Sequence, residues 1–296
     1  MGTTIATCAF PGTYDVDKSV ELHVSYIEEA AAAGAELVVF PECSLQGYPA
    51  DFRASEAAVS LKPFLKTAEK IADGPNVARI ADQAAEKGIY VIYGLNEATE
   101  RPGVIYNTMV LTGPDGLVGT FRKVHVGITE QVFWRRGDDW PVYETPFGNI
   151  GMLICYDKAW PETCRELTLR GADLLVMSTA WSLHNPSAGD DDVWVEQYKL
   201  YDQVRAVENS RWFVSSNFVG ELGGLHFFGL SQIIDPLGHV LATTGTSEAG
   251  LAIADVDIPG GILAAYGVSQ GAHIIRDRRP ETYKALAGTM PIAIDG

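Results

Sequence analysis

Short runs of apolar and other strand-favouring residues recur along the chain, and segments with helical periodicity separate them. A continuous apolar run bounded by turn residues is typical of a strand buried on both faces. Such a strand needs cover on each side, and helices provide that cover. The pattern therefore predicts an α/β fold with helices packed on a sheet. The runs are Thr4 to Phe10, Leu37 to Phe40, Ile89 to Leu95, Ile150 to Ile154, Leu174 to Met177 and Trp212 to Ser216.

Helices are expected between these runs. The first is indicated by apolar residues at helical spacing from Val20 to Ala31, with Gly34 as a stop signal. The longest runs from Asp190 to Asn209, with Leu200, Val204 and Val207 on one face. The others cover Lys62 to Lys87, broken near Gly74-Pro75, and Pro161 to Arg170.

The middle and the end of the chain predict further strands. Val104 to Leu111 and Leu117 to Phe121 flank the turn sequence Gly113-Pro114-Asp115-Gly116, which indicates a hairpin. Leu230 to Ile234 and Ala249 to Val256 are the last expected strands, and a tail of mixed composition follows Pro259-Gly260-Gly261. No linker interrupts the pattern, so we expect one domain over residues 1–258 and a C-terminal extension over 259–296.

The charge balance limits the partners. The chain has 38 acidic and 22 basic residues, a formal net charge of −16. Such a charge repels phosphate backbones and anionic lipids, so we expect neither nucleic acid nor membrane partners. We see no secretory signal, and no apolar stretch approaches the roughly 18 residues that suggest a membrane span. The four cysteines form no Cys-x-x-Cys pair, which is typical of reduced thiols in the cytoplasm.

Three chemically useful side chains follow predicted strands. Glu42 comes just after one buried strand, Lys123 ends another, and Cys155 ends a third just before a helix. Ligand sites of α/β sheets gather at the carboxyl ends of strands. A carboxylate can accept the thiol proton, and an ammonium can stabilise a thiolate or an oxyanion. Each residue alone has an ordinary structural explanation, and spacing alone does not bring the three together.

The motifs around these residues resemble those of the nitrilase superfamily of carbon–nitrogen hydrolases, in its amidase-type branches. The resemblance runs from about Thr4 to Val256. The matching stretches are Phe40-Pro41-Glu42, Phe121-Arg122-Lys123-Val124-His125, Ile154-Cys155-Tyr156-Asp157, Trp160-Pro161-Glu162, Arg205 to Asn209, Asn217 and Gly229 to Gly238.

The resemblance implies a four-layer α-β-β-α sandwich and a set of roles. Glu42 would be the general base, Cys155 the nucleophile and Lys123 the oxyanion stabiliser, helped by the backbone N–H of Tyr156. Glu130 fits the family's second glutamate, which positions the substrate and assists the base. No metal or organic cofactor is implied. In relatives, subunits pair so that the sandwich continues, and C-terminal tails cross to the partner, so a homodimer or larger homo-oligomer is expected.

Other residues have weaker assignments. Trp181 and Tyr156 are expected in the substrate pocket, and Tyr48, Trp134 and Phe228 are further candidates for its walls. A Cys–His dyad with His125 is conceivable, but this histidine belongs to the lysine motif, where a structural role is expected. The six histidines show no metal-binding spacing. Asp190-Asp191-Asp192 is interpreted as the acidic start of a helix rather than as a metal site.

The leading functional hypothesis is an amidase that releases ammonia from a small aliphatic amide or an ω-amide through a cysteine thioester. Tyr156-Asp157 after the cysteine favours amides over nitriles. Lys158 and Ala159 stand where carbamoylases of amino acids tend to have arginines, which makes an N-carbamoyl substrate less favoured. A catalytically inactive interaction protein of the same fold is the alternative from another class, and the presence of Glu42, Lys123 and Cys155 together argues against it.

Overall fold

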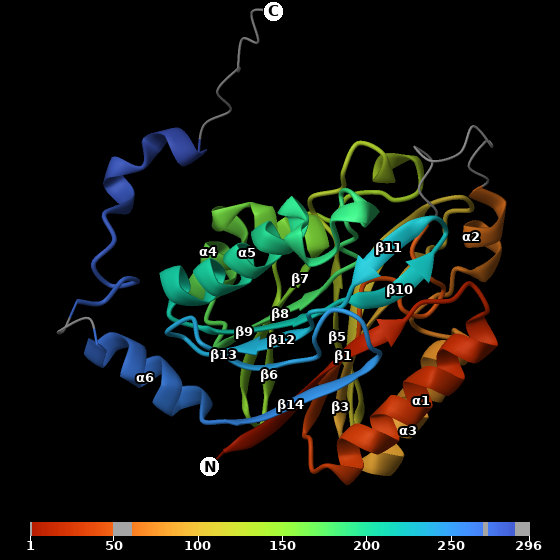
Figure 1. The fold of residues 1–296 in the computed structure, drawn as a ribbon, viewed down its shortest axis with the longest axis horizontal. Helices are drawn as coiled ribbons and strands as arrows, with labels where there is room; N and C mark the ends of the chain where they lie inside the picture. The colour runs from red at the N-terminus through yellow and green to blue at the C-terminus, as the bar shows by residue number, and fades with distance from the viewer. Residues whose placement is uncertain (1, 50–60, 269–271, 288–296) are drawn as a thin grey trace, which may run out of the picture.

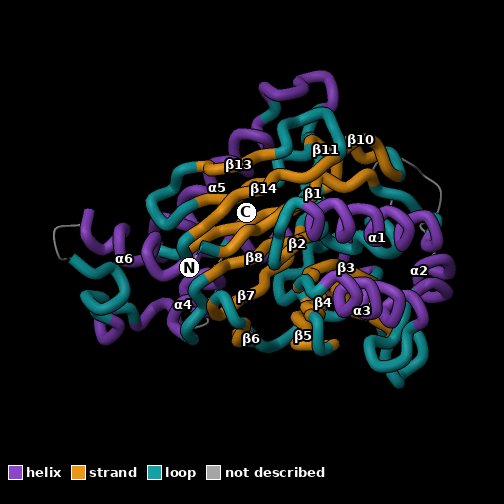
Figure 2. Tube along the Cα trace, turned by 90° about the horizontal axis from the view of Figure 1, so that it is seen from below, coloured by secondary structure: helices purple, strands orange, loops and turns teal. Residues whose placement is uncertain are grey.

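The predicted apolar runs form the centres of two β-sheets that pack face to face (Figures 1 and 2). The computed structural model describes residues 2–49, 61–268 and 272–287. Helices cover the outer face of each sheet, so the layers follow the order helix, sheet, sheet, helix, as expected.

The first sheet has the strand order β11-β10-β1-β2-β3-β4-β5, and β14 pairs antiparallel with β1. Strands β1, β2 and β3 are parallel, whereas β3, β4 and β5 form an antiparallel meander that includes the predicted hairpin. The strands are β1 (Thr3–Pro11), β2 (Leu37–Val39), β3 (Tyr90–Ala98), β4 (Ile105–Gly113), β5 (Gly116–Arg122), β10 (Phe218–Leu222), β11 (Leu225–Phe228) and β14 (Gly250–Val256).

The second sheet has the order β13-β12-β9-β8-β7-β6, and its central strands β7, β8 and β9 are parallel. The β10–β11 hairpin and the edge strands β6 and β13 are elements that the sequence patterns did not predict. The strands are β6 (Val142–Thr145), β7 (Gly148–Ile154), β8 (Leu174–Ser178), β9 (Trp212–Ser216), β12 (Gln232–Ile234) and β13 (Val240–Thr243).

Alternating side chains of one strand enter different layers of the core. Leu37 and Val39 of β2 lie between the sheets, where Met152 of β7 also packs. Val38, between them in sequence, points to the opposite face and packs in the cluster under the helices. Both faces of β2 are therefore buried, which explains why its sequence is apolar throughout.

The helices divide between the two outer layers. Helices α1 (Val16–Ala32) and α3 (Pro75–Lys87) pack on each other and cover the first sheet. Helices α4 (Pro161–Leu169) and α5 (Val193–Asn209) cover the second. The short α2 (Leu61–Thr67) lies beside β3. None of these described helices has both the length and the apolar character that a bilayer crossing needs.

Helix α5 differs from its prediction in two ways. Its first residue is Val193, because Asp192 caps it by accepting a hydrogen bond from the Trp194 N–H at 2.7 Å. The short 3-10 helix η3 (Pro186–Asp191) precedes it. The predicted apolar stripe faces outward: Leu200 is 61% exposed, and the buried face carries Tyr198, Asp202 and Arg205 instead.

The C-terminal region begins with a helix that was not predicted, because Pro259-Gly260-Gly261 is a sequence typical of a break in secondary structure. Helix α6 (Ile258–Val268) has Pro259 in its first turn, where its missing N–H costs nothing. A Cβ on Gly261 would lie 2.6 Å from the Trp212 ring, so this glycine lets α6 approach β9 closely. The 3-10 helices η4 (Pro280–Thr282) and η5 (Lys284–Ala287) follow.

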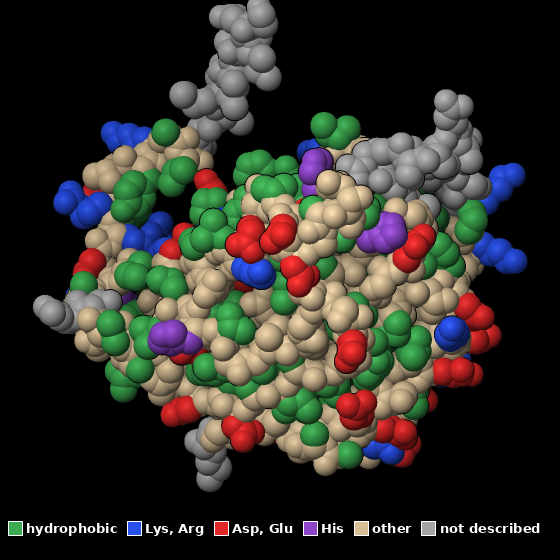
Figure 3. Space-filling model, in the orientation of Figure 1, with side chains coloured by type: hydrophobic (Ala, Val, Ile, Leu, Met, Phe, Trp, Pro, Cys, Tyr) green, Lys and Arg blue, Asp and Glu red, His purple; other side chains and the backbone are tan. Residues whose placement is uncertain are grey.

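The extension beyond residue 258 projects beside the body of the molecule (Figure 1). Figure 3 shows basic side chains on this segment, whereas carboxylates are spread over the rest of the same face. Residues 269–271 and 288–296 of the expected extension lie outside the described residues. The domain boundary at 258 and the passage of the tail to a partner stay predictions.

Candidate active site

The three strand ends predicted from the sequence meet at one edge of the sandwich. Glu42 follows β2, Lys123 comes directly after β5 and Cys155 directly after β7. Strands β2 and β5 run in the same direction in one sheet, and β7 faces them from the other. The Ala180 N–H, just after β8, donates a hydrogen bond of 3.0 Å to Glu42 Oε2 and so joins the two sheets at this edge.

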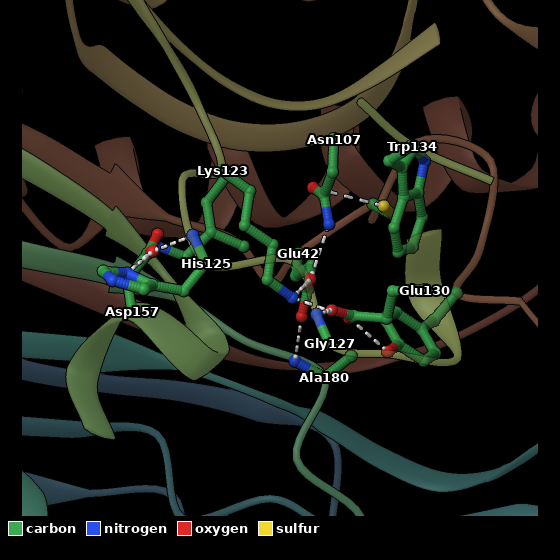
Figure 4. A network of polar contacts seen from close by, with 12 residues as sticks. Glu42, Asn107, Lys123, His125, Gly127, Glu130, Trp134, Asp157 and Ala180 are labelled. Carbon is green, nitrogen blue, oxygen red and sulfur yellow. Dashed lines mark hydrogen bonds and ion pairs between the residues drawn. The ribbon is translucent and has the colours of Figure 1, made fainter. Parts of the chain in front are cut away.

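Glu42 is fully buried and accepts hydrogen bonds at both oxygens (Figure 4). Its Oε1 receives the Asn107 Nδ2 donor at 2.6 Å and the Lys123 ammonium at 2.7 Å. With Ala180 on Oε2, three donors from different elements fix the carboxylate. Asn107 lies inside β4, and nothing in the sequence around it distinguished it from an ordinary strand residue.

The turn that carries Glu42 needs a glycine on the neighbouring strand. A Cβ built on Gly94 of β3 would lie only 2.3 Å from the backbone nitrogen of Cys43. Any side chain at this position would push the turn away. The close approach of β3 therefore helps to set where the Glu42 carboxylate points.

Glu130 lies on the other side of Lys123 in the 3-10 helix η1 (Glu130–Val132). Its Oε1 accepts the Lys123 ammonium at 2.6 Å and the Tyr48 hydroxyl at 2.6 Å. Its Oε2 accepts the Gly127 N–H at 2.7 Å. The structure thus brings the predicted Glu130 into contact with the lysine, and Lys123 is a buried ammonium held between two carboxylates (Figure 4).

The two carboxylates have opposite pKa shifts. Burial raises the pKa of Glu42 above its ordinary value, and the negative charge of Glu130 adds to this rise. Burial also acts to raise the pKa of Glu130, but the charge and hydrogen bond of Lys123 and the hydrogen bond of Tyr48 outweigh it, so this pKa falls. Burial opposes the charge of Lys123, yet its carboxylate neighbours hold its pKa well above the usual range. Glu42 is therefore the more basic of the two carboxylates and the better proton acceptor.

The thiol of Cys155 is within electrostatic reach of all three groups. Its pKa is raised to about 12, chiefly by burial and next by the charge of Glu42, while the charge of Lys123 opposes the rise. Cys155 has a φ of 48°, a left-handed conformation that costs a residue with a side chain on the order of 1–3 kcal/mol. It opens the 3-10 helix η2 (Cys155–Ala159), whose first N–H groups, that of Tyr156 included, have no partner within the helix.

Asp157 fixes this strained turn. It is fully buried and accepts hydrogen bonds from the Ile154 N–H at 3.0 Å and the His125 N–H at 2.8 Å. His125 Nδ1 lies 2.8 Å from the same carboxylate, and its ring stacks on Trp160 with centroids 5.2 Å apart. The imidazole thus joins the lysine motif to the cysteine motif, which is the structural role expected for it. Asp157 was not among the predicted site residues.

A cavity of about 690 Å³ opens onto Cys155 and Glu130. Tyr156 and Trp181 line it as predicted, and so do Tyr48 and Trp134. The prediction for Phe228 is wrong, because its side chain is 3% exposed and packs against Tyr198 in the core beneath the second sheet. Four other lining residues were not predicted for the pocket: Arg136, Trp160, Trp194 and Tyr201.

A metal-binding cluster of three or more His, Cys, Asp or Glu side chains is absent from residues 2–49, 61–268 and 272–287. In the acidic run at residues 190–192, Asp192 is engaged as the cap of α5 and also accepts the Asn185 N–H at 2.6 Å.

Comparison with known proteins gives consistent results. The model of the carbon–nitrogen hydrolase family matches residues 4–266. A probable nitrilase of Schizosaccharomyces pombe is 33% identical over 281 residues, covering 93% of this chain and 95% of the relative. An omega-amidase of Homo sapiens is 30% identical and covers 88% of each.

Among solved structures, a mutant of the amidase from Nesterenkonia sp. AN1 is similar, with a TM-score of 0.73 and 25% identity over 96% of both chains. In that structure the acetamide moiety of fluoroacetamide is covalently added at the active site cysteine. The same α-β-β-α arrangement thus carries a reactive cysteine in that amidase.

Proposed function

Because the chain belongs to the carbon–nitrogen hydrolase family, we propose that it is an amidase that converts a small aliphatic amide or an ω-amide to a carboxylic acid and ammonia. The observation that carries the proposal is the buried Lys123 ammonium between Glu42 and Glu130, beside the Cys155 thiol. This arrangement supplies a nucleophile on the cavity wall, together with a fully buried proton acceptor and a fully buried cation for an oxyanion.

Acylation begins at the thiol. The raised pKa of Cys155 keeps it protonated at neutral pH, so its proton must move to Glu42 as sulfur attacks the amide carbonyl carbon. The carbonyl electrons pass to oxygen, and Lys123 with the Tyr156 N–H stabilises that oxyanion. When the oxyanion collapses, the C–N bond breaks, nitrogen takes the proton from Glu42, and ammonia leaves a thioester on Cys155.

Deacylation uses the same groups. Water gives a proton to Glu42 and attacks the thioester carbon, and the new oxyanion lies at the same cation. The C–S bond then breaks, the acid leaves, and Glu42 returns the proton to sulfur. Glu130 holds the Lys123 ammonium in place through both halves, because its hydrogen bonds to Tyr48 and Gly127 fix it independently of Glu42. No step requires a metal, so EDTA is expected to leave the rate unchanged.

The residues after the nucleophile support an amide rather than an N-carbamoyl amino acid. A carbamoylase of that kind needs a cation near the cysteine for the substrate carboxylate. Lys158 occupies such a place in sequence, but its side chain is fully buried and pairs with Asp202 at 2.6 Å. Its charge is therefore satisfied within the protein, and Lys158 is not among the residues that line the cavity.

The choice between aliphatic amides and ω-amides depends on one lining residue. Arg136 is a basic residue of the cavity wall and can pair with the distal carboxylate of an ω-amide. The aromatic walls formed by Trp160, Trp181 and Tyr201 suit an apolar acyl chain instead. Arg136→Gln should lower kcat/KM for ω-amides and leave that for propionamide unchanged if the ω-amide is the natural class.

The experiment that tests the proposal measures kcat/KM for propionamide, an ω-amide of a dicarboxylate, propionitrile and an N-carbamoyl amine. We expect ammonia release from at least one of the two amides to be the fastest. Faster hydrolysis of propionitrile would make the protein a nitrilase, and release from the carbamoyl compound alone would make it a carbamoylase. An absence of covalent labelling and of turnover with every compound would favour an inactive interaction protein.

A further inference from the structure

A second fully buried lysine lies three residues after the nucleophile and has no part in the steps above. Lys158 belongs to η2, the turn that begins at Cys155. Its ammonium pairs with Asp202 of α5 at 2.6 Å, and the other oxygen of Asp202 accepts the Ser215 hydroxyl at 2.7 Å. The turn of the nucleophile is thereby tied to α5 and, through Ser215, to β9.

The same ammonium lies against two aromatic rings. Its Nζ is 3.5 Å from the ring centroid of Tyr198 and 4.5 Å from that of Trp181. Trp181 lines the cavity, and its backbone is held by Asn217, whose Oδ1 accepts the Trp181 N–H at 2.9 Å. Lys158 therefore contacts the indole that forms a wall of the cavity, while Asn217 fixes its main chain.

A third contact links the same turn to α5. Arg205 Nε donates to the backbone oxygen of Lys158 at 2.8 Å, and Arg205 Nη2 donates to that of Ala159 at 3.2 Å. Arg205 is neutralised by Glu208 at 2.8 Å. The backbone of the turn is thus held by Arg205, so the charged side chain of Lys158 is not needed merely to keep the turn closed.

A buried ion pair is a costly way to fill this space. Removing two charges from water carries a penalty that their attraction often fails to recover, and well-packed apolar residues of similar volume are frequently as stable. Burial lowers the pKa of Lys158, and the charge of Asp202 opposes that change. A function beyond stability would account for a charge placed here.

We propose that Lys158 is a positioning residue for the hydrolytic reaction, whose buried ammonium fixes the Trp181 indole of the cavity wall relative to the Cys155 turn. This rests on the proposed function for its kinetic consequences only. A negative charge on Cys155 stabilises the protonated form of Lys158, so the two groups are in electrostatic reach and the effect is reciprocal.

The groups that face Cys155 and Lys158 set the pH behaviour to be measured. Glu42, Lys123 and Glu130 act on the thiol from the strand-end side. Asp202, Arg205 and the Tyr198 ring act on Lys158 from α5. Lys158→Met removes a cation from the α5 side only, so the pKa of Cys155 should rise while the contacts of Glu42 and Lys123 persist. Replacing Asp202 as well removes an anion, so the rise should be smaller in a variant that lacks both charges.

The test compares Lys158→Met, the double variant Lys158→Met/Asp202→Leu and the control Lys199→Met. The double variant replaces the ion pair by apolar side chains, so no buried charge is left unpaired if the single variant fails to fold. Lys199→Met removes a partly exposed lysine of α5, the helix that carries Asp202, where it pairs with Glu196. Thermal unfolding, kcat and KM, and the pH dependence of Cys155 alkylation by iodoacetamide are measured for each.

We expect the double variant to unfold near the wild-type temperature, to lose on the order of 10- to 100-fold in kcat with little change in KM, and to be alkylated only at higher pH. Lys199→Met should match the wild type in all three. Recovery of wild-type kcat and alkylation in the double variant would overturn the proposal, because the pair would then be purely structural. The alkylation profile needs no turnover, so it tests Lys158 even if the wild type fails to hydrolyse amides and the amidase proposal falls.

Discussion

Replacing Glu42 by Gln removes the proposed proton acceptor with the smallest change in shape. The carboxylate accepts from Asn107 and Lys123 at one oxygen and from Ala180 at the other. A glutamine has one acceptor oxygen. If that oxygen keeps Asn107 and Lys123, its amide NH₂ faces the Ala180 N–H, and two donors meet without an acceptor. A buried group left unsatisfied in this way costs about 1–3 kcal/mol, so we expect a lower Tm but a folded protein.

The loss of activity follows from the thiol. With a pKa of about 12, about one thiol in 10⁴ is ionised at pH 8. In the wild type the small ionised fraction does not limit the rate, because Glu42 takes the thiol proton during attack. General bases typically increase reaction rates by about 10²- to 10⁴-fold. The Glu42 charge itself raises the pKa of Cys155, so its removal partly compensates and about 10⁴ is an upper limit. We expect kcat/KM to fall by about 10²- to 10⁴-fold.

The pH dependence of the residual rate distinguishes this explanation from a general loss of structure. Without the base, turnover depends on thiolate formed by solvent, and the thiolate fraction rises about tenfold per pH unit below its pKa. The residual kcat/KM of Glu42→Gln should therefore climb steeply between pH 7 and 10, where the wild-type rate should not.

Glu97→Gln is the matched control. Glu97 is also a buried carboxylate, and it accepts hydrogen bonds from Thr108 Oγ1 and Arg122 Nε, each at 2.7 Å, outside the cavity lining. It should lose stability while keeping the wild-type rate. A Glu42→Gln variant within tenfold of wild type, or one whose residual rate is flat with pH, would refute the assignment of Glu42 as base.

Three further predictions concern the neighbouring groups and the assembly. Tyr48→Phe removes a hydrogen bond that lowers the pKa of Glu130, so Glu130 should take up its proton at a higher pH. The acid limb of the pH profile of kcat/KM should therefore move to higher pH. An unmoved acid limb would show that the protonation of Glu130 does not cause it. Cys155→Ala should abolish turnover while the protein stays folded, whereas Cys164→Ala, at a buried cysteine, should keep most of the turnover. Mass spectrometry should find acyl adducts on Cys164→Ala and none on Cys155→Ala. Light scattering at micromolar concentration should give at least twice 32.0 kDa, since Leu200 on α5 and Leu263 on α6 are 61% and 71% exposed; a monomer mass would contradict the expected homo-oligomer.

The α/β class of this fold was predictable from residue patterns because burial on both faces makes a strand apolar throughout, whereas the stacking of two sheets was implied only by the family resemblance. Strand β2 is apolar at every position, since Val38 packs under a helix and its neighbours pack between the sheets. The order and register of the strands in the sheets have no such local sequence signature. β14 returns to β1 across more than two hundred residues, and the register depends on contacts that no short window contains. The edge strands β6 and β13 were missed for a related reason: half-exposed strands carry mixed sequences that resemble loops.

Local sequence also led to wrong predictions for two helices, the start of α6 and the buried face of α5. The Pro259-Gly260-Gly261 sequence indicates a break, yet α6 starts there because the proline occupies the first turn and Gly261 allows contact with Trp212. On α5, the predicted apolar stripe lies on the outer face, and the buried face mixes apolar residues with the polar Asp202 and Arg205, which serve the site. Its inward residues Asp202 and Arg205 bind the nucleophile turn, so hydrophobic periodicity assigned the helix correctly but not its buried face.

The site itself shows where local motifs stop being informative. Glu42, Lys123 and Cys155 were found because each follows a predicted strand and because the motifs around them resemble those of the nitrilase superfamily. The residues that make them a working unit are not at strand ends: Asn107 lies within β4, and Asp202 lies in mid-helix. Each acts on a partner far away in sequence, Asn107 on Glu42 and Asp202 on Lys158. A buried polar residue of this kind is distinguished only by the charge it meets in the folded protein. The nucleophile and its chemistry can therefore be predicted from local sequence motifs. The groups that orient it can be identified only in the folded protein, where the two sheets and α5 surround it.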